Sequence, residues 1–137
     1  MNTGGFFYIY AFSEIGVMAK IVPIKENYLF SKVYAKGKKA SGKFVAVYAL
    51  RNYKSGDTCL GITTGKKMGN AVQRSRARRL IREAYRAASL EKKWRKPFWI
   101  VVVARSSLAE KNCKMQDVLF DLEKAFAKLS LFCGEEN

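Results

Sequence analysis

Residues 65–86 place the strongest constraint on how this chain can fold. The stretch reads GKKMGNAVQRSRARRLIREAYR, and after Gly69 and Asn70 it runs through six arginines without Pro or Gly. Asn is a preferred N-cap because its side-chain oxygen can accept from the first unpaired backbone N–H groups of a helix. The stretch therefore predicts a helix that begins after Asn70 and covers about residues 71–89.

The predicted helix has one cationic face and one apolar face. At about 100° per residue, five arginines fall within an arc of roughly 140°; they are Arg74, Arg78, Arg79, Arg82 and Arg86. Tyr85 lies at the border of the opposite arc, which holds Ala77, Leu80, Ile81, Ala84 and Ala88. Since an apolar stripe must be buried against another element, the helix has to pack on a further layer.

The charge of this region is more one-sided than a solvated helix face usually is. The chain carries a formal charge of +15, and between residues 65 and 96 twelve Lys and Arg stand against Glu83 and Glu91. Clustered basicity of this kind is typical of proteins that bind nucleic acid or anionic membranes. A membrane-surface helix needs bulky apolar anchors, whereas this apolar face is rich in alanine. The pattern favours a nucleic acid.

The sequence lacks the residue combinations of common catalytic sites. There is no His, which excludes Ser-His-Asp and Cys-His catalysis and His-ligated metals. GITTGKK resembles a phosphate-binding loop, but only three residues separate Gly61 from Gly65, and Lys67 replaces the required hydroxyl. The cysteines are far apart, which favours reduced thiols in a cytosolic protein; they are Cys59, Cys113 and Cys133.

The segments before the arginine helix predict a helix and two strands. Residues 26–36 have helical spacing and end at Gly37. Residues 43–51 and 57–64 are rich in strand-forming types and flank the turn-like NYKSGD. Residues 43–64 are therefore predicted to form an antiparallel hairpin.

The segments after it predict a strand and a last helix. FWIVVVAR is a continuous apolar run, as expected of a buried central strand over 98–104. Apolar residues at steps of three and four predict a helix over 115–131, with Asp117, Asp121 and Glu123 expected on its outer face. The order of elements is that of an α+β fold, a single-domain sandwich of a small mixed sheet and packed helices.

The domain boundaries follow from the two ends. We assign residues 1–18 to a poorly ordered N-terminal extension, 19–133 to one nucleic-acid-binding domain and 134–137 to a tail. The apolar run FFYIYAF near the start is too short to cross a bilayer. Met18 could itself begin translation, which favours treating the preceding residues as an extension.

Residues 66–83, KKMGNAVQRSRARRLIRE, resemble the signature of the bacterial ribonuclease P protein component. The family pattern is K-K-x-G-N-A-V-x-R-N-R-x-[KR]-R-x-x-R-[EQ], and the chain departs from it at Ser75, where the family usually has Asn. YLFSKVYAKGKK is similar to the family's first helix and KFVAVYAL to its first strand. FWIVVVAR and the last helix are similar to its tail, so the resemblance covers about residues 20–130.

The resemblance implies a compact α-β sandwich with a left-handed βαβ crossover, and a protein that acts as a subunit. With a catalytic RNA, such a subunit removes the 5′ leader from precursor tRNA by endonucleolytic hydrolysis and broadens substrate recognition. The RNA carries the chemistry and holds most of the Mg²⁺. We therefore expect no catalytic or metal-binding residue in the protein, no organic cofactor, one protein per RNA, no membrane contact and a cytoplasmic location.

The resemblance also implies two binding surfaces. Residues expected to contact the catalytic RNA are Lys66, Lys67, Asn70, Arg74, Ser75, Arg76, Arg78, Arg79 and Arg82, to which the cationic face adds Arg86. Residues expected to bind the single-stranded leader, in a cleft between the first helix and the sheet, are Phe30, Tyr34 and Tyr48. Spacing alone favours core packing for these three side chains, whereas the resemblance favours stacking on bases of the leader. The alternative function is that of a structural RNA-binding protein, such as a ribosomal component, which activity on precursor tRNA would distinguish.

Overall fold

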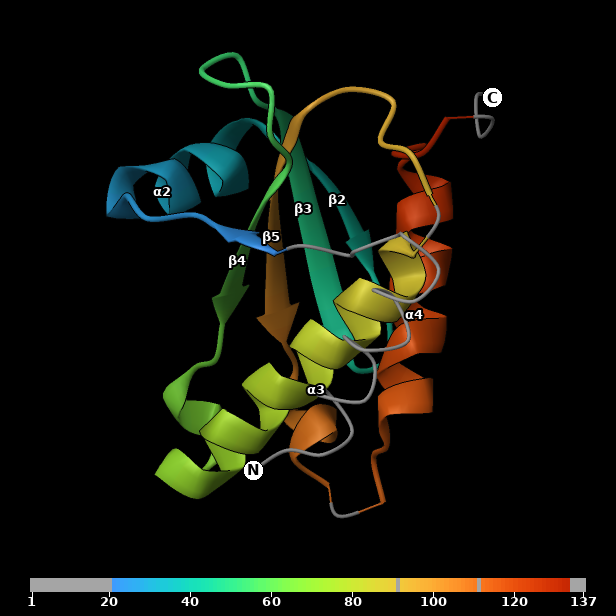
Figure 1. Cartoon of the computed structure of the whole chain (residues 1–137). Coiled ribbons are helices and arrows are strands. Elements are labelled where there is room, and N and C mark those ends of the chain that lie inside the picture. The colour runs from blue at the N-terminus through green and yellow to red at the C-terminus, as the bar shows by residue number, and fades with distance from the viewer. Residues whose placement is uncertain (1–20, 91, 111, 134–137) are drawn as a thin grey trace.

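The structure is a computed structural model that describes residues 21–90, 92–110 and 112–133 (Figure 1). Its helices and strands are, in chain order, β1 (Val22–Pro23), α2 (Asn27–Lys36), β2 (Lys38–Ser41), β3 (Val45–Arg51), β4 (Cys59–Thr63), η1 (Lys66–Met68), α3 (Ala71–Ser89), β5 (Phe98–Ala104), η2 (Ser106–Ala109) and α4 (Met115–Lys128). The predicted extension 1–18 and tail 134–137 lie outside the described residues. Within the described part, no helix is both long and apolar enough to cross a membrane.

The strands form one mixed sheet in the order β1-β4-β5-β3-β2, with β5 at the centre. β5 is parallel to β4 and antiparallel to β3. Every residue of β5 except Val103 is buried. The continuous apolar run thus correctly predicted a central strand, because such a strand is covered on both faces.

The predicted hairpin over residues 43–64 is wrong. β5 lies between its two strands, since Trp99 pairs with Leu50 of β3 on one side and with Cys59 of β4 on the other. The strand with two apolar faces takes the central position, and the loop 52–58 passes over it. The hairpin in this fold is β2–β3, in which Ser41 pairs with Ala46.

Two short edge strands were not predicted. In β2 only Ala40 is buried, and two lysines precede it. Lysine on an edge strand protects the free edge from pairing with another chain, and it also hides the alternation that identifies a strand. β1 has two residues, one of them Pro23, and runs parallel to β4 at the other edge.

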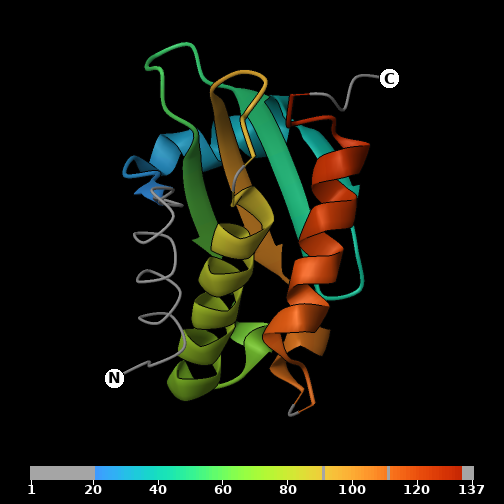
Figure 2. The same ribbon diagram turned by 45° about the vertical axis from the view of Figure 1, so that its right-hand side comes forward.

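Helices cover both faces of the sheet. α3 and α4 lie side by side on one face and α2 lies on the other (Figures 1 and 2). The larger core cluster, under α3 and α4, includes Ile81, Ile100 and Phe126. The smaller cluster, under α2, consists of Leu29, Val33, Trp99 and Val101. These layers confirm the predicted α+β sandwich.

The connection from β4 through α3 to β5 is left-handed, as the family resemblance implied. In Figure 1 both strands point down, α3 lies in front of the sheet, and β5 is to the right of β4. A right-handed crossover, which is the usual form, would place β5 to the left in this view. The crossover brings the N-terminus of α3 close to the carboxyl end of β4.

Asp121 does not lie on the outer face of α4 as predicted. It is 8% exposed, and its Oδ2 accepts hydrogen bonds from the backbone N of Phe44 at 2.6 Å and of Val45 at 3.3 Å. Its spacing from the buried Val118 and Ala125 puts it on the inner stripe of the helix. The carboxylate therefore ties α4 to the turn between β2 and β3.

Candidate nucleic-acid interface

The N-terminus of α3 is fixed by a reciprocal pair of hydrogen bonds. Asn70 Oδ1 accepts from the backbone N of Gln73 at 3.0 Å, and Gln73 Oε1 accepts from the backbone N of Asn70 at 2.9 Å. Gly69 has a φ of +106°, where a side chain would be strained. This capping box confirms the predicted start of the helix. Lys66 and Lys67 lie just before it in η1, where Lys67 is exposed.

The inner face of α3 is the predicted one. Tyr85, expected at the border, is only 2% exposed, and its ring stacks on Trp94 with the centroids 6.0 Å apart. The other buried residues are Ala77, Leu80, Ile81, Ala84 and Ala88. The helix packs mainly against α4 and to a smaller extent against β5, so its outer face points away from both elements.

The outer face presents a row of guanidinium groups, which we call the arginine face. Arg79 and Arg82 are exposed, and Arg74, Arg78 and Arg86 are half-buried. Burial, followed by the neighbouring Arg82 charge, lowers the pKa of Arg86. Arginine remains protonated in proteins despite such a shift. The crowding of like charges creates the positive potential that attracts a polyanion.

Arg76 lies off the arginine face. Its Nη2 donates to the carbonyl oxygen of Cys113 at 2.5 Å, which connects α3 to the segment before α4. Arg74 also has a partner within the chain, because its Nη1 donates to the carbonyl oxygen of Gly69 at 2.9 Å. These two arginines support the local structure, whereas Arg79 and Arg82 extend from it into solvent.

A surface cavity of about 390 Å³ lies along the first turns of α3. Ser75 lines it and is exposed. Val72, which was not predicted as a site residue, also lines the cavity and is 76% exposed. The signal was present, because at 100° per residue Val72 falls between Arg79 and Glu83, away from the apolar arc. The usual assignment of a helical valine to the core prevailed over that position. Arg76 and Arg79 complete the cationic side of the cavity.

Three aromatic residues gather on the other face of the sheet, beside α2, and we call them the aromatic patch. The rings of Tyr34 and Tyr48 meet edge to face, with centroids 5.0 Å apart. The Tyr34 hydroxyl and Thr63 Oγ1 are 2.7 Å apart and share a hydrogen bond. Tyr34 is 38% exposed, so part of its ring faces solvent. Phe30 completes the patch.

Phe30 is half-buried and packs against the smaller core cluster. It lies directly over Gly61 of β4, since a Cβ added there would be 2.6 Å from two carbons of its ring. Phe30 therefore packs against the core, as its spacing favoured, and the part of it that is not buried remains accessible on the same face of the sheet. Gly61, which the sequence suggested only as part of a failed phosphate-loop motif, makes room for it.

One lysine lies beside the patch, and two others contact aromatic rings of α2 or of the cluster under it. Lys39 Nζ is 5.4 Å from the ring centroid of Tyr48, and Lys32 Nζ is 5.4 Å from that of Trp99. Lys54 Nζ donates to the hydroxyl of Tyr28. Neither these lysines nor Thr63 were predicted, because they come from separate elements that only the sheet order brings together.

β4 joins the two surfaces. Its last residue, Thr63, contacts Tyr34 of the aromatic patch, and η1 with Lys66 and Lys67 follows shortly after in the chain. No group of three or more Cys, Asp or Glu side chains that could hold a metal ion occurs among the described residues. The two surfaces together present cationic side chains, which can bind phosphates, and aromatic rings, which can stack on bases.

The family model described as Ribonuclease P matches residues 18–130. A ribonuclease P protein component from Thermoanaerobacter sp. (strain X514) is 36% identical over 117 residues, covering 85% of this chain and 97% of that relative. One from Clostridioides difficile (strain 630) is 37% identical over 106 residues, covering 77% and 86%.

Solved structures of similar proteins share the fold. The RNase P protein of Staphylococcus aureus superposes with a TM-score of 0.70 at 28% identity, covering 82% of this chain and 99% of that one. The RNase P protein from Thermotoga maritima, in complex with 1-(4-fluorophenyl)-2-thiourea, has a TM-score of 0.61 at 25% identity, with 73% and 94% covered.

Proposed function

Because this chain belongs to the ribonuclease P protein family, we propose that it joins a catalytic RNA and that the complex removes the 5′ leader from precursor tRNA. One observation carries the proposal. The last residue of β4 contacts the aromatic patch, and the chain continues from β4 through η1 into the helix that carries the arginine face. One protein binds one RNA, and the complex works in the cytoplasm. The chain contributes binding surfaces, and the RNA contributes the chemistry.

The arginine face and the loop before it bind the phosphate backbone of the catalytic RNA. Contacts of this kind release counterions and position the protein without reading sequence. The exposure of Arg79 and Arg82 supports this role. The full set is Lys66, Lys67, Asn70, Arg74, Ser75, Arg76, Arg78, Arg79, Arg82 and Arg86.

The aromatic patch binds the single-stranded leader. Unpaired bases stack on aromatic rings with about 1–3 kcal/mol each, largely regardless of sequence. Tyr34 is accessible for such a stack, and Tyr48 lies beside it with Lys39 near enough to meet a phosphate. Phe30 forms the floor next to Gly61. A lack of sequence reading suits a subunit that serves many precursor tRNAs.

The two surfaces divide the work. The arginine face holds the protein on the RNA, and the patch adds affinity only for a substrate that still has its leader. Mature tRNA lacks the leader and gains nothing from the patch, so substrate is favoured over product. Broader substrate recognition follows, since the leader contact adds to contacts that the RNA makes itself.

We assign the Mg²⁺ ions of the complex to the RNA. Mg²⁺ prefers oxygen ligands, above all carboxylates and phosphates. The described residues of the arginine face offer guanidinium groups, which repel cations, so this surface does not fit a magnesium site. Phosphates of the bound RNA are the available ligands.

Reconstitution with the cognate catalytic RNA tests the proposal. The affinities for leader-bearing and leaderless tRNA are measured with and without the protein, together with cleavage at the 5′ end. The expected result is cleavage at the leader junction and a protein-dependent gain in affinity that is confined to leader-bearing tRNA. Equal gains for both substrates would refute leader binding, and the absence of any effect on cleavage would favour a structural RNA-binding role.

A further inference from the structure

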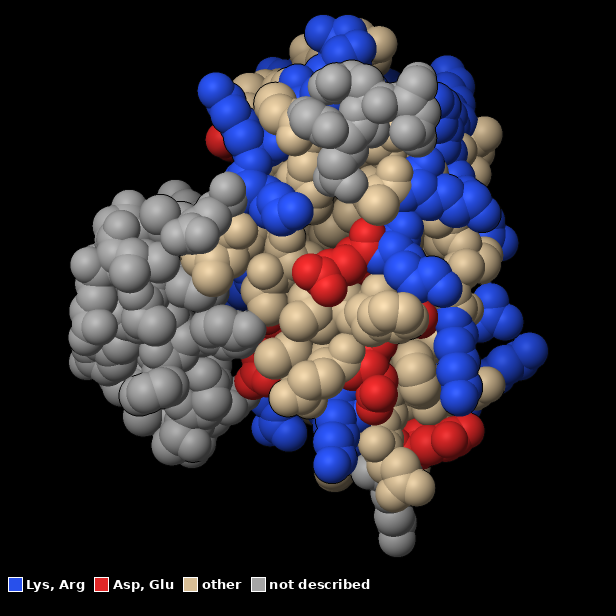
Figure 3. Space-filling view, turned by 90° about the vertical axis from the view of Figure 1, so that its right-hand side faces the viewer, with Lys and Arg blue, Asp and Glu red and all other residues tan. Residues whose placement is uncertain are grey.

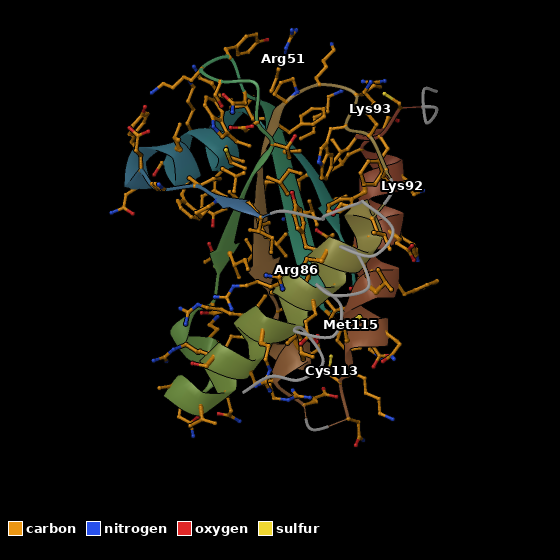
Figure 4. The ribbon with its side chains drawn as sticks, in the orientation of Figure 1. Arg51, Arg86, Lys92, Lys93, Cys113 and Met115 are labelled. Atoms are coloured by element: carbon orange, nitrogen blue, oxygen red, sulfur yellow. The ribbon has the colours of Figure 1, made fainter. Side chains whose placement is uncertain are left out.

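A second cationic region lies at the end of the sheet away from the start of α3. Figure 4 shows Arg51, Lys93 and Lys92 in the upper part of the molecule, whereas α3 begins at the bottom. They belong to the end of β3 and to the segment between α3 and β5. Neither the arginine face nor the aromatic patch includes this region.

A cavity of about 280 Å³ opens there. Five cations line it, from the end of α2, the start of β2, the end of β3 and the segment before β5; they are Lys36, Lys38, Arg51, Arg95 and Lys96. Its remaining lining is apolar apart from Tyr53, and no acidic residue takes part. We call it the upper basic cavity. Its charge favours an anion, and its size suits one nucleotide unit better than a folded partner.

Backbone hydrogen bonds fix the walls of the upper basic cavity. The backbone N of Arg95 donates to the carbonyl oxygen of Leu131 at 2.8 Å, and the backbone N of Asn52 donates to that of Pro97 at 2.9 Å. The first bond ties the segment before β5 to the residues that follow α4, and the second ties it to the residue that follows β3. The cations are therefore carried by an ordered frame, which lowers the entropic cost of binding.

The loop after β3 holds one aromatic ring out into solvent. Asn52 is 4% exposed, and its Oδ1 accepts from the backbone N of Lys54 at 2.8 Å and of Ser55 at 3.1 Å. This turn leaves Tyr53 76% exposed, with the Arg51 guanidinium carbon 5.0 Å from its ring centroid. A ring this exposed contributes little to the core. An arginine next to an accessible ring suits a base and its phosphate.

We propose that the upper basic cavity binds a further segment of single-stranded RNA, with a base on Tyr53 and its phosphate between Arg51, Arg95 and Lys96. This segment is distinct from the leader on the aromatic patch, because no residue that lines the upper basic cavity belongs to that patch. Ala49 and Phe98 of the cavity belong to the core cluster under α3 and α4, and Leu50 packs on the cluster under α2, so the cavity lies at the end of the sheet and not on the face that carries the patch. An acidic peptide would satisfy the cations but would leave the ring unused.

The test is an NMR titration of the ¹⁵N-labelled chain with a short oligouridylate. Backbone signals of Arg51, Tyr53 and Lys96 are expected to shift and to saturate. Tyr53→Ala should weaken binding at these signals about fivefold or more, which corresponds to the loss of one stacked base. The double substitution Arg51→Ala/Lys96→Ala should abolish the shifts. All three side chains are exposed, and the remaining signals report whether each variant is folded.

Lys43→Ala/Lys124→Ala is the matched control, because it removes the same charge from the cavity between the β2–β3 turn and α4. It should leave the shifts at Arg51, Tyr53 and Lys96 intact. The proposal is overturned if oligouridylate does not shift these signals, if the control abolishes them equally, or if a polyglutamate of matched length shifts them with equal affinity. The signals of Tyr34 and Tyr48 report leader binding separately in the same spectra, so failure of one site is distinguishable from failure of the other.

Discussion

The arginine face and the aromatic patch differ in how many elements build them. The arginine face comes from one helix, whose 3.6-residue period aligns its side chains without help from the remaining fold. The aromatic patch takes Phe30 and Tyr34 from α2 and Tyr48 from β3, and Thr63 of β4 holds Tyr34 through a hydrogen bond. A surface on one helix is encoded locally, whereas a surface across three elements exists only once the strands are correctly ordered.

The largest expected effect comes from the inner face of α3. Ile81 is fully buried, so Ile81→Ala should lower the free energy of unfolding by about 2–5 kcal/mol through lost burial and a residual cavity. Urea denaturation measures the loss. Val72→Ala on the exposed side of the same helix is the control and should stay within about 0.5 kcal/mol. Similar losses for both would mean that α3 does not have the two faces described.

Gly61→Ala perturbs the aromatic patch from below. The added methyl would meet the Phe30 ring, and overpacking of this kind costs about 1–3 kcal/mol. Thermal unfolding measures the cost, and affinity for a leader oligonucleotide should fall with it while assembly with the catalytic RNA persists. In a Phe30→Ala background the same change should cost less, because the clash is gone. If Gly61→Ala destabilised the Phe30→Ala variant as much as the unaltered chain, its effect would not come from a clash with the Phe30 ring.

Arg79→Ala/Arg82→Ala perturbs the arginine face alone. If each side chain contacts one phosphate, the salt slope of RNA binding should fall by about 1.4–1.8, with roughly 10–30-fold weaker binding near physiological salt. Lys124→Ala/Lys128→Ala removes the same charge from exposed positions on α4 and should change the slope much less. Equal salt slopes for the two variants would mean that RNA responds to the net charge of the chain and makes no specific contact with the arginine face.

The smallest expected effect comes from Tyr34→Phe, which removes the hydrogen bond to Thr63 and keeps the ring. The free energy of unfolding should fall by about 0.5–1.5 kcal/mol, as is usual for one hydrogen bond. Binding of the leader should change little, because stacking uses the ring. A large loss of leader affinity without a loss of stability would instead assign the hydroxyl to the RNA.

The sequence predicted what periodicity alone determines. The two faces of α3, its capped start at Asn70 and the buried strand β5 were all predicted, because each depends on neighbours in the chain. Even Asp121 was predictable in principle, since its spacing from Val118 and Ala125 places it inward. Asp121 was nevertheless predicted on the outer face, because a carboxylate is usually exposed to solvent.

Strand pairing could not be predicted in the same way. Residues 43–51 and 57–64 are neighbours in sequence, yet β5 arrives later in the chain and separates them. Which strand lies at the centre of the sheet depends on how all the strands are buried, and no local sequence pattern determines this order. The contact of Thr63 with Tyr34 and the position of Lys39 beside Tyr48 follow from that order, so these two neighbours of the patch had no signal in the sequence.

The central claim is that the two surfaces bind different RNAs, and a thermodynamic cycle tests it most directly. Affinities of the reconstituted complex for leader-bearing and leaderless tRNA are compared between the unaltered chain and Tyr34→Ala/Tyr48→Ala, with Arg79→Ala/Arg82→Ala as the second arm. The loss caused by removing the tyrosines should be about 1–3 kcal/mol per stacked base with the leader present and should vanish without it. The arginine variant should weaken assembly with the catalytic RNA whether or not the substrate has a leader. An equal loss from the tyrosine variant on leaderless tRNA would contradict the account.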